Sequence, residues 1–392
     1  MKIKSVEAHV LEAPLSQPFS WSFNRAESRA ACLVEITCSD GTIGWGECYG
    51  PAALTAVIVR AFAPLLVGAD PRTRDALWAK LYNQTRDTGQ KGLTVCAISG
   101  VDIALWDIAG KHYGVPIHEL MGGPVRRKVE AYATGTYRRD EGDPRDYVVE
   151  EVRGHLNQGF KAVKLKIGRQ PADDIALIKA VHEAMAQHAG RQGEAPARLM
   201  LDANHGYDII EAIKVGRAVG DLNIDWFEEP VVPDNLEAYV EVRRGQPIPV
   251  AGGETDYTRW GFREIFTRRA MDIVQPDTCA AGGLSEAKKI ADMAAAFEVR
   301  YVPHVWGTGV GLAAALHLLA VLPYQPLRYE PREPLLEFDR TEHPIRQAVL
   351  RMPIEPSQGL VDVPSGPGLG IDINREALTR FAAGRGGVST RQ

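Results

Sequence analysis

The sequence predicts an α/β fold: a modified TIM-like (β/α)7β barrel preceded by an α+β N-terminal capping domain, which the C-terminal segment completes. Three observations lead to this prediction. Residues 1–60 alternate between apolar and polar side chains as strands do, and residues 72–121 carry apolar side chains at helical spacing. From Val129 onward, short apolar strands alternate with amphipathic helices, and eight strand candidates fall within about 200 residues, as in a parallel barrel.

The capping domain is expected to begin as a small sheet. Residues 3–11 alternate, and residues 32–38 (CLVEITC) are rich in β-formers and end at a Ser-Asp-Gly turn. Residues 97–111 (AISGVDIALWDIAGK) have the periodicity of a helix. We therefore place the capping domain at residues 1–127, the barrel at 128–364, and the segment that returns to the capping domain at 365–392.

The expected barrel strands are short apolar runs separated by helical patterns. In chain order they are VEAYAT, AVKLKI, ARLMLDA, IDWFEEP, IPVAGGE, MDIVQPD, VRYVPHV and PLRYE. In such barrels the chemistry lies at the C-terminal ends of the strands. The polar residues that end these runs are therefore the candidate functional residues.

Composition limits the classes of function. The formal net charge is −5 and no long basic run occurs, which argues against nucleic acid or an anionic membrane surface as the partner. The sequence has no run of about 18 apolar residues and no apolar signal core. The 5 cysteines form no CxxC pair, so we expect reduced thiols in a cytoplasmic protein that acts on a small molecule.

Three carboxylates end successive strand candidates: Asp202, Glu228 and Glu254, each 26 residues after the one before. Neighbouring strands lie about 4.8 Å apart, so these side chains can converge on one point. Converging carboxylates repel one another unless a cation lies between them, and an all-oxygen site suits Mg²⁺. We therefore expect one Mg²⁺ per subunit at this position.

Two lysines lie on the strand before the carboxylates. Lys164 and Lys166 are two positions apart and share one face of the strand, while Val163, Leu165 and Ile167 occupy the other face. Inward lysines in a central barrel strand need a reason. Burial and mutual repulsion are expected to lower the pKa of a lysine toward neutrality, which would make it a general base.

Asp277 ends the sixth strand candidate and His304 the seventh, across the barrel from the lysines. They are one β/α unit apart, so a hydrogen bond between them is geometrically reasonable. The carboxylate would orient the imidazole and raise its basicity. Trp306 shares the inward face with His304 and is suited to pack against a ring or a carbon chain of a ligand.

Loop residues near the barrel mouth are further candidates. The glycines of WGTGVG, from Trp306 onward, either present backbone amides to a substrate or form a tight loop. Capping-domain loops at 15–24 and 47–51 are expected to close over the mouth. Trp21 and Tyr49 are candidate substrate contacts there, with ordinary packing as the alternative.

Lys-x-Lys followed by Asp, Glu and Glu, and then Asp with His, resembles the mandelate racemase subgroup of the enolase superfamily over nearly the whole chain. The resemblance implies Mg²⁺-dependent removal of a proton next to a carboxylate. It implies that Lys166 is one acid/base, that His304 with Asp277 forms the second, and that Lys164 stabilises the substrate carboxylate. The implied metal ligands are Asp202, Glu228 and Glu254.

Several runs narrow the resemblance to cycloisomerases that open aldarate lactones, galactaro or glucaro, by β-elimination to a 3-deoxy-2-keto aldarate. These runs are RDTGQKGL, ALWDIAGKHYG, DANHGY, IDWFEEPVVP, AGGET, VPHVWGTGV and EFDRTEHPIRQAVL. An acid-sugar dehydratase, an anhydro-sugar acid cycloisomerase and a racemase or epimerase would use the same residues. A barrel that only binds a ligand is an alternative of another class, and it has no need of paired bases.

The resemblance also implies contacts and an assembly. Residues 328–331 (RYEP) carry Glu330 where those cycloisomerases have a neutral residue, and the subgroup places a substrate-contacting glutamate near the eighth strand. That glutamate is Glu330 or Glu337, with Glu337 in LLEFD preferred. Relatives are usually multimers, so a homo-oligomer, often an octamer, is expected. The expected substrate contacts are Asn204, Trp306, Glu337, Glu330, Trp21 and Tyr49.

Overall fold

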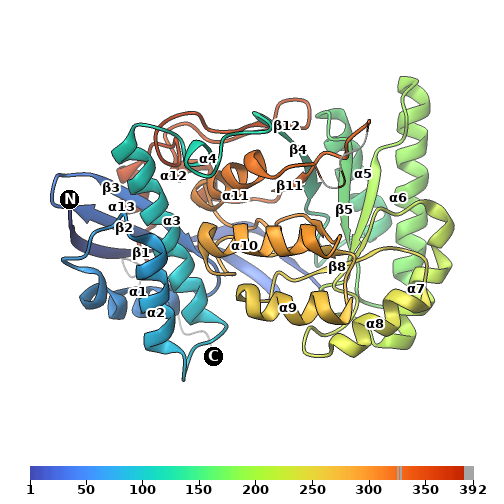
Figure 1. Ribbon diagram of the computed structural model, residues 1–392. Helices are drawn as coiled ribbons and strands as arrows, with labels where there is room; N and C mark the ends of the chain where they lie inside the picture. Colours follow the sequence, from blue (N-terminus) through green and yellow to red (C-terminus); the bar gives the residue numbers. More distant parts are fainter. Residues whose placement is uncertain (325, 327–328, 384–392) are drawn as a thin grey trace, which may run out of the picture.

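The computed structural model describes residues 1–324, 326 and 329–383 of the chain. An α+β capping domain lies at one end of the molecule and an α/β barrel at the other (Figure 1). The chain runs from the capping sheet through the barrel and then back to the capping domain. The predicted fold class is confirmed.

The capping sheet is antiparallel in the order β1–β2–β3. Its strands β2 and β3 are joined by a tight turn at Gly41, which adopts φ 87°. Helix α3 approaches β3 closely, because a Cβ atom at Gly46 would lie 1.9 Å from the carbonyl oxygen of Gly100. The elements are β1 (Ile3–Ser20), β2 (Arg25–Cys38), β3 (Ile43–Cys48), α1 (Ala52–Leu66), α2 (Arg74–Thr85), α3 (Leu93–Tyr113) and α4 (Ile117–Leu120).

Helix α3 is the one helix in the described part of the chain that is long and apolar enough to cross a membrane, judged by length and composition. Most of its residues are buried, and several of them belong to the hydrophobic core of the capping domain. Burial in that core accounts for its apolar composition.

Eight parallel strands form the barrel. Strands β4 to β10 neighbour one another in chain order, and β11 pairs with β4. The strands are β4 (Lys128–Thr134), β5 (Ala162–Lys166), β6 (Arg198–Asp202), β7 (Phe227–Glu228), β8 (Val250–Gly252), β9 (Ile273–Val274), β10 (Arg300–Tyr301) and β11 (Leu335–Asp339). The barrel helices are α5 (Pro144–Asn157), α6 (Pro171–Gln192), α7 (Ile209–Ala218), α8 (Leu236–Gly245), α9 (Thr258–Arg268), α10 (Gly283–Ala296), α11 (Gly309–Val321) and α12 (Pro344–Val349).

The prediction for the eighth strand was wrong in position. The run PLRYE covers residues 326–330, of which 327 and 328 lie outside the described residues, and the other three form bends. The eighth strand is instead β11, whose Glu337 pairs in register with Tyr132 of β4. Pro326 begins the predicted run and Pro331 follows it, and neither has a backbone N–H to donate, whereas every residue of β11 is buried.

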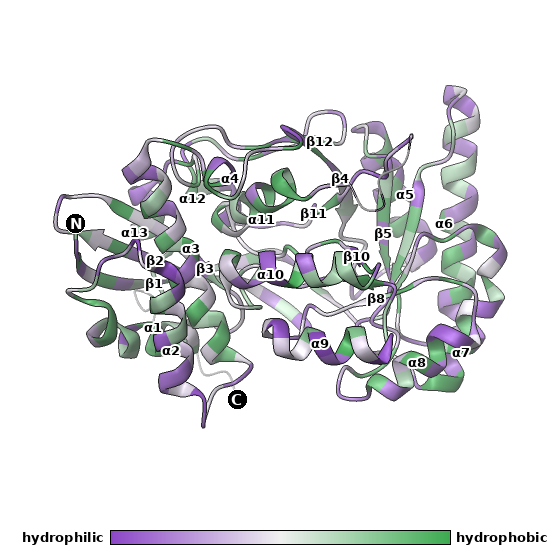
Figure 2. Cartoon of the chain, in the orientation of Figure 1, coloured by the Kyte–Doolittle hydropathy of each residue, from purple (hydrophilic) through white to green (hydrophobic). Residues whose placement is uncertain are grey.

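The barrel interior is packed rather than open. One side chain from each strand, or from the residue beside it, forms a buried layer near the barrel floor: Tyr132, Ala162, Met200, Trp226, Ala251, Ile273, Val302 and Leu335. Helix α11 is hydrophobic along its length (Figure 2), and all of its residues are buried. The polar residues at the strand ends therefore lie above a buried layer of side chains that supports them.

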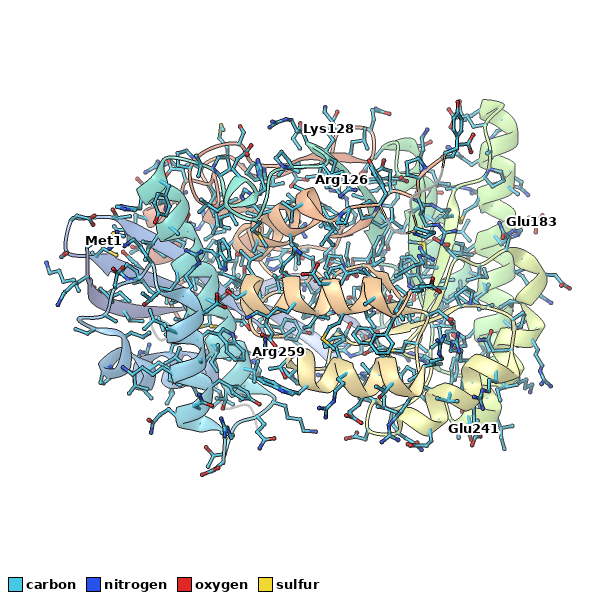
Figure 3. The ribbon with its side chains drawn as sticks, in the orientation of Figure 1. Met1, Arg126, Lys128, Glu183, Glu241 and Arg259 are labelled. Carbon is cyan, nitrogen blue, oxygen red and sulfur yellow. The ribbon has the colours of Figure 1, made fainter. Side chains whose placement is uncertain are left out.

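The capping domain and the barrel touch at several places. Arg259, at the start of α9 and labelled in Figure 3, has its guanidinium 5.7 Å from the centroid of the Trp78 ring in α2. After β12 (Leu360–Asp362), which pairs with β4, the C-terminal segment carries α13 (Arg375–Phe381) and reaches the capping sheet, where the amide of Ala383 donates to the carbonyl of Val10 at 2.8 Å. The boundaries placed at 127/128 and 364/365 stay a prediction.

Candidate active site

The ends of β5, β6 and β7 bring two lysines and two carboxylates together. Lys166 pairs in register with Asp202, and Asp202 with Glu228. The ammonium group of Lys164 lies 2.5 Å from Glu228 Oε1 and 2.7 Å from Glu337 Oε1. Lys166 Nζ lies 2.5 Å from Asp202 Oδ2. The strand register thus produces a buried cluster of alternating charge.

The protonation of the lysines is decided by the carboxylates. Burial is the largest effect and lowers the pKa of both lysines, but the neighbouring charges together outweigh it, chiefly Glu228 and Glu337 at Lys164 and Asp202 at Lys166, so both pKa values are raised. The expectation of a lowered lysine pKa therefore does not hold for this arrangement. Mutual repulsion of the two ammonium groups is smaller than their attraction to the carboxylates that lie between them.

The second half of the site lies at the ends of β9 and β10. His304 Nδ1 is 2.7 Å from Asp277 Oδ2, and His304 Nε2 is 3.4 Å from Glu254 Oε2. Asp277 is itself held by the amide of Cys279, which donates to Oδ1 at 2.6 Å. Burial lowers the pKa of His304, but Glu254 and Asp277 outweigh it and raise the pKa to about 10.

The carboxylates outnumber the cations that accompany them. Burial raises the pKa of Glu228 to about 7, and burial with the charge of Glu254 raises the pKa of Glu229 well above its usual value. Glu229 Oε1 is buried and has no hydrogen-bond partner. Excess buried negative charge and an all-oxygen donor set fit a divalent cation such as Mg²⁺.

The carboxylate oxygens of the three expected metal ligands lie farther from one another than three donor atoms around a single ion would. Within the described residues, the one group of His, Cys, Asp or Glu with three potential donor atoms inside 4.8 Å of one another is Glu7, His9 and Glu35 in the capping domain. Glu35 is there already paired with Arg375 at 2.6 Å. At the barrel mouth, lysine ammonium groups lie between the carboxylates instead.

The expected substrate contacts fall into two groups. Asn204 Oδ1 is 2.9 Å from Lys166 Nζ, and Glu337 is buried beside Lys164, so both belong to the charged cluster. Glu330, in contrast, is exposed in the bends that precede β11. It lies on the N-terminal side of the strand while the site lies toward the C-terminal ends, so Glu337 is the better placed of the two glutamates.

The capping domain closes over His304. The Tyr49 ring meets the imidazole edge-on at a centroid distance of 5.5 Å, and Trp21 meets Trp306 at 6.0 Å. Together with Arg25, these aromatic residues line a cavity of about 450 Å³. The structure thus brings Trp21, Tyr49, His304 and Trp306 to one cavity.

Sequence reasoning missed a capping-domain residue at the mouth. Glu47 accepts hydrogen bonds from the amides of Thr308 and Gly311, both at 2.8 Å. Two amides of the glycine loop that was considered for substrate binding are thus engaged by a glutamate of the same chain. A lone glutamate near a strand end gives no sequence signal for such a contact, since its partners lie more than 260 residues away.

Comparison with known proteins agrees with this site. Residues 147–377 match the family model described as enolase C-terminal domain-like, and residues 5–122 match the mandelate racemase / muconate lactonizing enzyme N-terminal domain. The chain belongs to this family. It is an enzyme of the enolase superfamily, as the Lys-x-Lys, carboxylate and Asp-His pattern predicted.

Relatives within the family include sugar-acid enzymes. The chain is 52% identical to the D-galactarolactone cycloisomerase of Agrobacterium fabrum over 97% of this chain and 99% of that one. It is 37% identical to the arabinonate dehydratase of Saccharolobus solfataricus over 87% of each chain. The crystal structure of the 3,6-anhydro-D-galactonate cycloisomerase of Zobellia galactanivorans aligns with a TM-score of 0.87 at 38% identity, covering 97% of this chain and 99% of that one.

Proposed function

We propose that this enzyme removes the proton α to the carboxylate of an aldarate lactone, galactaro or glucaro, and expels the ring oxygen from the β-carbon to give a 3-deoxy-2-keto aldarate. The observation that carries the proposal is the pair of acid/base groups, Lys166 and the His304–Asp277 dyad, with a carboxylate cluster between them. A site that only binds a ligand has no use for two such groups. The 52% identical cycloisomerase supports the substrate class.

The reaction begins with removal of the α-proton, for which the site offers two candidate bases. In its neutral form, Lys166 or His304 takes the α-proton, depending on which face of the carbon carries it, and a cation held by the neighbouring carboxylates would lower the raised pKa of both groups toward that form. The electron pair left on the carbon forms the enol double bond, the β-carbon–oxygen bond breaks, and the ring oxygen leaves as a carboxylate oxygen. The enol then gains a proton at the β-carbon and becomes the 2-keto acid. No external oxidant or water is consumed.

The enediolate needs positive charge beside its oxygens. Lys164 offers an ammonium group two residues from Lys166 on the same strand face, where charge develops. Asp202, Glu228 and Glu254 are the residues that would hold Mg²⁺, one per subunit. When bound, Mg²⁺ supplies Lewis-acid stabilisation to the substrate carboxylate.

The cavity charge favours a lactone over the open-chain diacid. Among the described residues that line it, Arg25 is the one Lys or Arg. Its guanidinium is already paired with both oxygens of Asp140, with Nη2 2.8 Å from Oδ2, and lies 3.4 Å from Glu27. A second substrate carboxylate would meet no free cation there, whereas the uncharged lactone end requires none.

A dehydratase acting on an aldonate is the second candidate. An aldonate also carries a single carboxylate, so the same charge argument admits it, and the 37% identical arabinonate dehydratase supports it. The two functions differ in the leaving group, which is a ring oxygen in the lactone and a hydroxyl in the aldonate.

The test is a substrate panel read by ¹H NMR for keto-acid formation. Galactaro- and glucaro-lactones, galactarate, galactonate and arabinonate are each incubated with enzyme and Mg²⁺. We expect turnover of a lactone and little of galactarate; turnover of galactarate but not of its lactone would overturn the proposal. EDTA treatment is expected to abolish turnover and added Mg²⁺ to restore it, whereas full activity after EDTA contradicts the metal role.

Asp140→Asn tests the charge argument directly. The substitution frees Arg25 to pair with a second carboxylate, so we expect the ratio of kcat/KM for galactarate to that for the lactone to rise about tenfold. Asp143→Asn is the matched control, because Asp143 pairs with Arg145 and does not line the cavity. An unchanged ratio in Asp140→Asn would mean that Arg25 does not set the preference.

The proposal extends to the assembly and its location. We propose a homo-oligomer, an octamer by analogy with the family, that works in the cytoplasm on small sugar acids. Light scattering of the purified full-length chain checks the oligomer, and a monomer in solution would contradict it.

A further inference from the structure

Glu47 lies near the end of the capping strand β3 and is buried against the barrel. Its carboxylate accepts three hydrogen bonds: from the Thr308 amide at 2.8 Å, from the Thr308 hydroxyl at 2.7 Å and from the Gly311 amide at 2.8 Å. Thr308 is the N-cap residue of α11. A capping-domain side chain therefore holds the first turn of a barrel helix, where a negative charge is favourable.

The glycines of this loop make room for that carboxylate. A Cβ atom at Gly307 would lie 2.5 Å from Glu47 Oε1. A Cβ atom at Gly311 would lie 3.1 Å from Glu47 Oε2 and 2.8 Å from Cys279 Sγ. Gly307 and Gly311 are thus explained by the close approach of Glu47 rather than by a ligand, and Gly309 by Leu350, whose Cδ1 would lie 2.4 Å from a Cβ atom there.

The end of β3 also contacts the loop after β9, which carries Asp277. The amide of Tyr49 donates to the carbonyl of Cys279 at 3.0 Å, and the amide of Cys279 donates to Asp277 at 2.6 Å. The Tyr49 ring also packs edge-on against His304. Residues 47–49 therefore contact both the segment that carries Asp277 and the segment that carries His304.

We propose that Glu47 is a positioning residue for the acid/base dyad. It fixes the segment 304–311 against the capping domain, so that His304 keeps its alignment with Asp277 and with the cavity. Lys166, Asp202 and Glu228 lie on β5, β6 and β7, away from this contact, whereas Glu254 touches His304 itself. Loss of Glu47 should therefore lower the rate of the chemical step more than it weakens substrate binding.

Glu47→Gln tests the proposal, with Glu35→Gln as the matched control. A glutamine at 47 keeps the size but turns an NH₂ group toward amide donors, so at least one hydrogen bond is lost. Glu35 is also a buried glutamate of the capping sheet, but its partners are His9 and Arg375, far along the chain from the dyad. Both variants remove one buried, hydrogen-bonded charge, and only one of them touches the 304–311 segment.

Two measurements are made on the full-length protein. Hydrogen–deuterium exchange with mass spectrometry needs no substrate, and we expect peptides covering residues 304–311 to exchange at least about tenfold faster in Glu47→Gln than in Glu35→Gln. Steady-state kinetics rest on the proposed function: with the substrate found by the panel, we expect kcat to fall about 10- to 100-fold and KM to change less than about threefold.

The outcomes separate the two proposals. Exchange at 304–311 that matches the control, or a kcat that matches the control, overturns the role of Glu47. If no sugar acid is turned over by the wild type, the proposed function fails while the exchange measurement still decides whether Glu47 holds the segment. Should Glu47→Gln not fold, Thr308→Val keeps the carboxylate and removes two hydrogen bonds, the one that the Thr308 hydroxyl donates to Glu47 and the one that it accepts from the Val310 amide, and the same changes are expected at smaller size.

Discussion

At the scale of the residue, a carboxylate partner decides what each candidate acid/base can do. His304 donates through Nδ1 to Asp277, which fixes the ring so that Nε2 faces the interior beside Glu254. Lys166 is held in the same manner by Asp202 and Asn204. Each candidate nitrogen atom is thereby held beside its own carboxylate, Lys166 Nζ at Asp202 and His304 Nε2 at Glu254.

Asp277→Asn is expected to lower kcat about 10- to 100-fold, because the amide can no longer balance a charged imidazolium or hold its tautomer. Steady-state kinetics with the substrate from the panel provide the measurement. Asp272→Asn serves as the control. Asp272 lies just before β9, at the end of the strand opposite to Asp277, and pairs with Arg243. Equal activity in the two variants would show that Asp277 does not support His304.

At the scale of the element, the loops that follow neighbouring strands are packed so closely that backbone meets backbone. Gly168, just after β5, adopts φ +91°, and a Cβ atom there would lie 2.1 Å from the carbonyl oxygen of Ala203. Ala203 follows Asp202 directly at the end of β6. The loops that follow Lys166 and Asp202 therefore touch at Gly168, a position where a side chain would collide with the backbone of Ala203.

Gly168→Ala is expected to destabilise the protein by about 2 kcal/mol or more and to lower kcat, because the added methyl group must push the β5 and β6 ends apart. Thermal unfolding and kinetics measure the two effects. Gly193→Ala is the control: Gly193 has φ +69° at the end of α6 and open space around it, so only backbone strain of about 1 kcal/mol is expected. A Gly168→Ala variant as active as this control would contradict the prediction.

At the scale of the whole molecule, a buried histidine pair joins three parts of the chain. His118 of α4 and His317 of α11 have their Nδ1 atoms 3.0 Å apart, and His317 Nε2 lies 3.1 Å from the carbonyl of Leu369 in the returning segment. Burial lowers the pKa of both, and that of His317 falls to about 4. The pair is therefore neutral in the folded enzyme at neutral pH.

The lowered pKa of His317 predicts an acid-sensitive junction. The unfolded imidazole has a pKa of about 6.5, so this contribution is complete above pH 6.5 and is lost as the pH falls toward 4, by about 2 kcal/mol at pH 5. We expect the difference between the unfolding midpoints at pH 7.5 and pH 5 to be smaller in His317→Gln than in His112→Gln. His112 is exposed and serves as the control. Equal pH dependence in both variants would contradict the assignment.

The sequence alone determined the fold class, the family and the order of residues at the strand ends. Strand and helix periodicity is local, and one β/α unit has a nearly constant length, so Asp202, Glu228 and Glu254 could be aligned by counting. Only the tertiary structure separated Glu337 from Glu330, raised the lysine pKa values and joined Glu47 to the loop of His304. Each of these depends on distances between residues far apart in the chain, which neither periodicity nor spacing encodes.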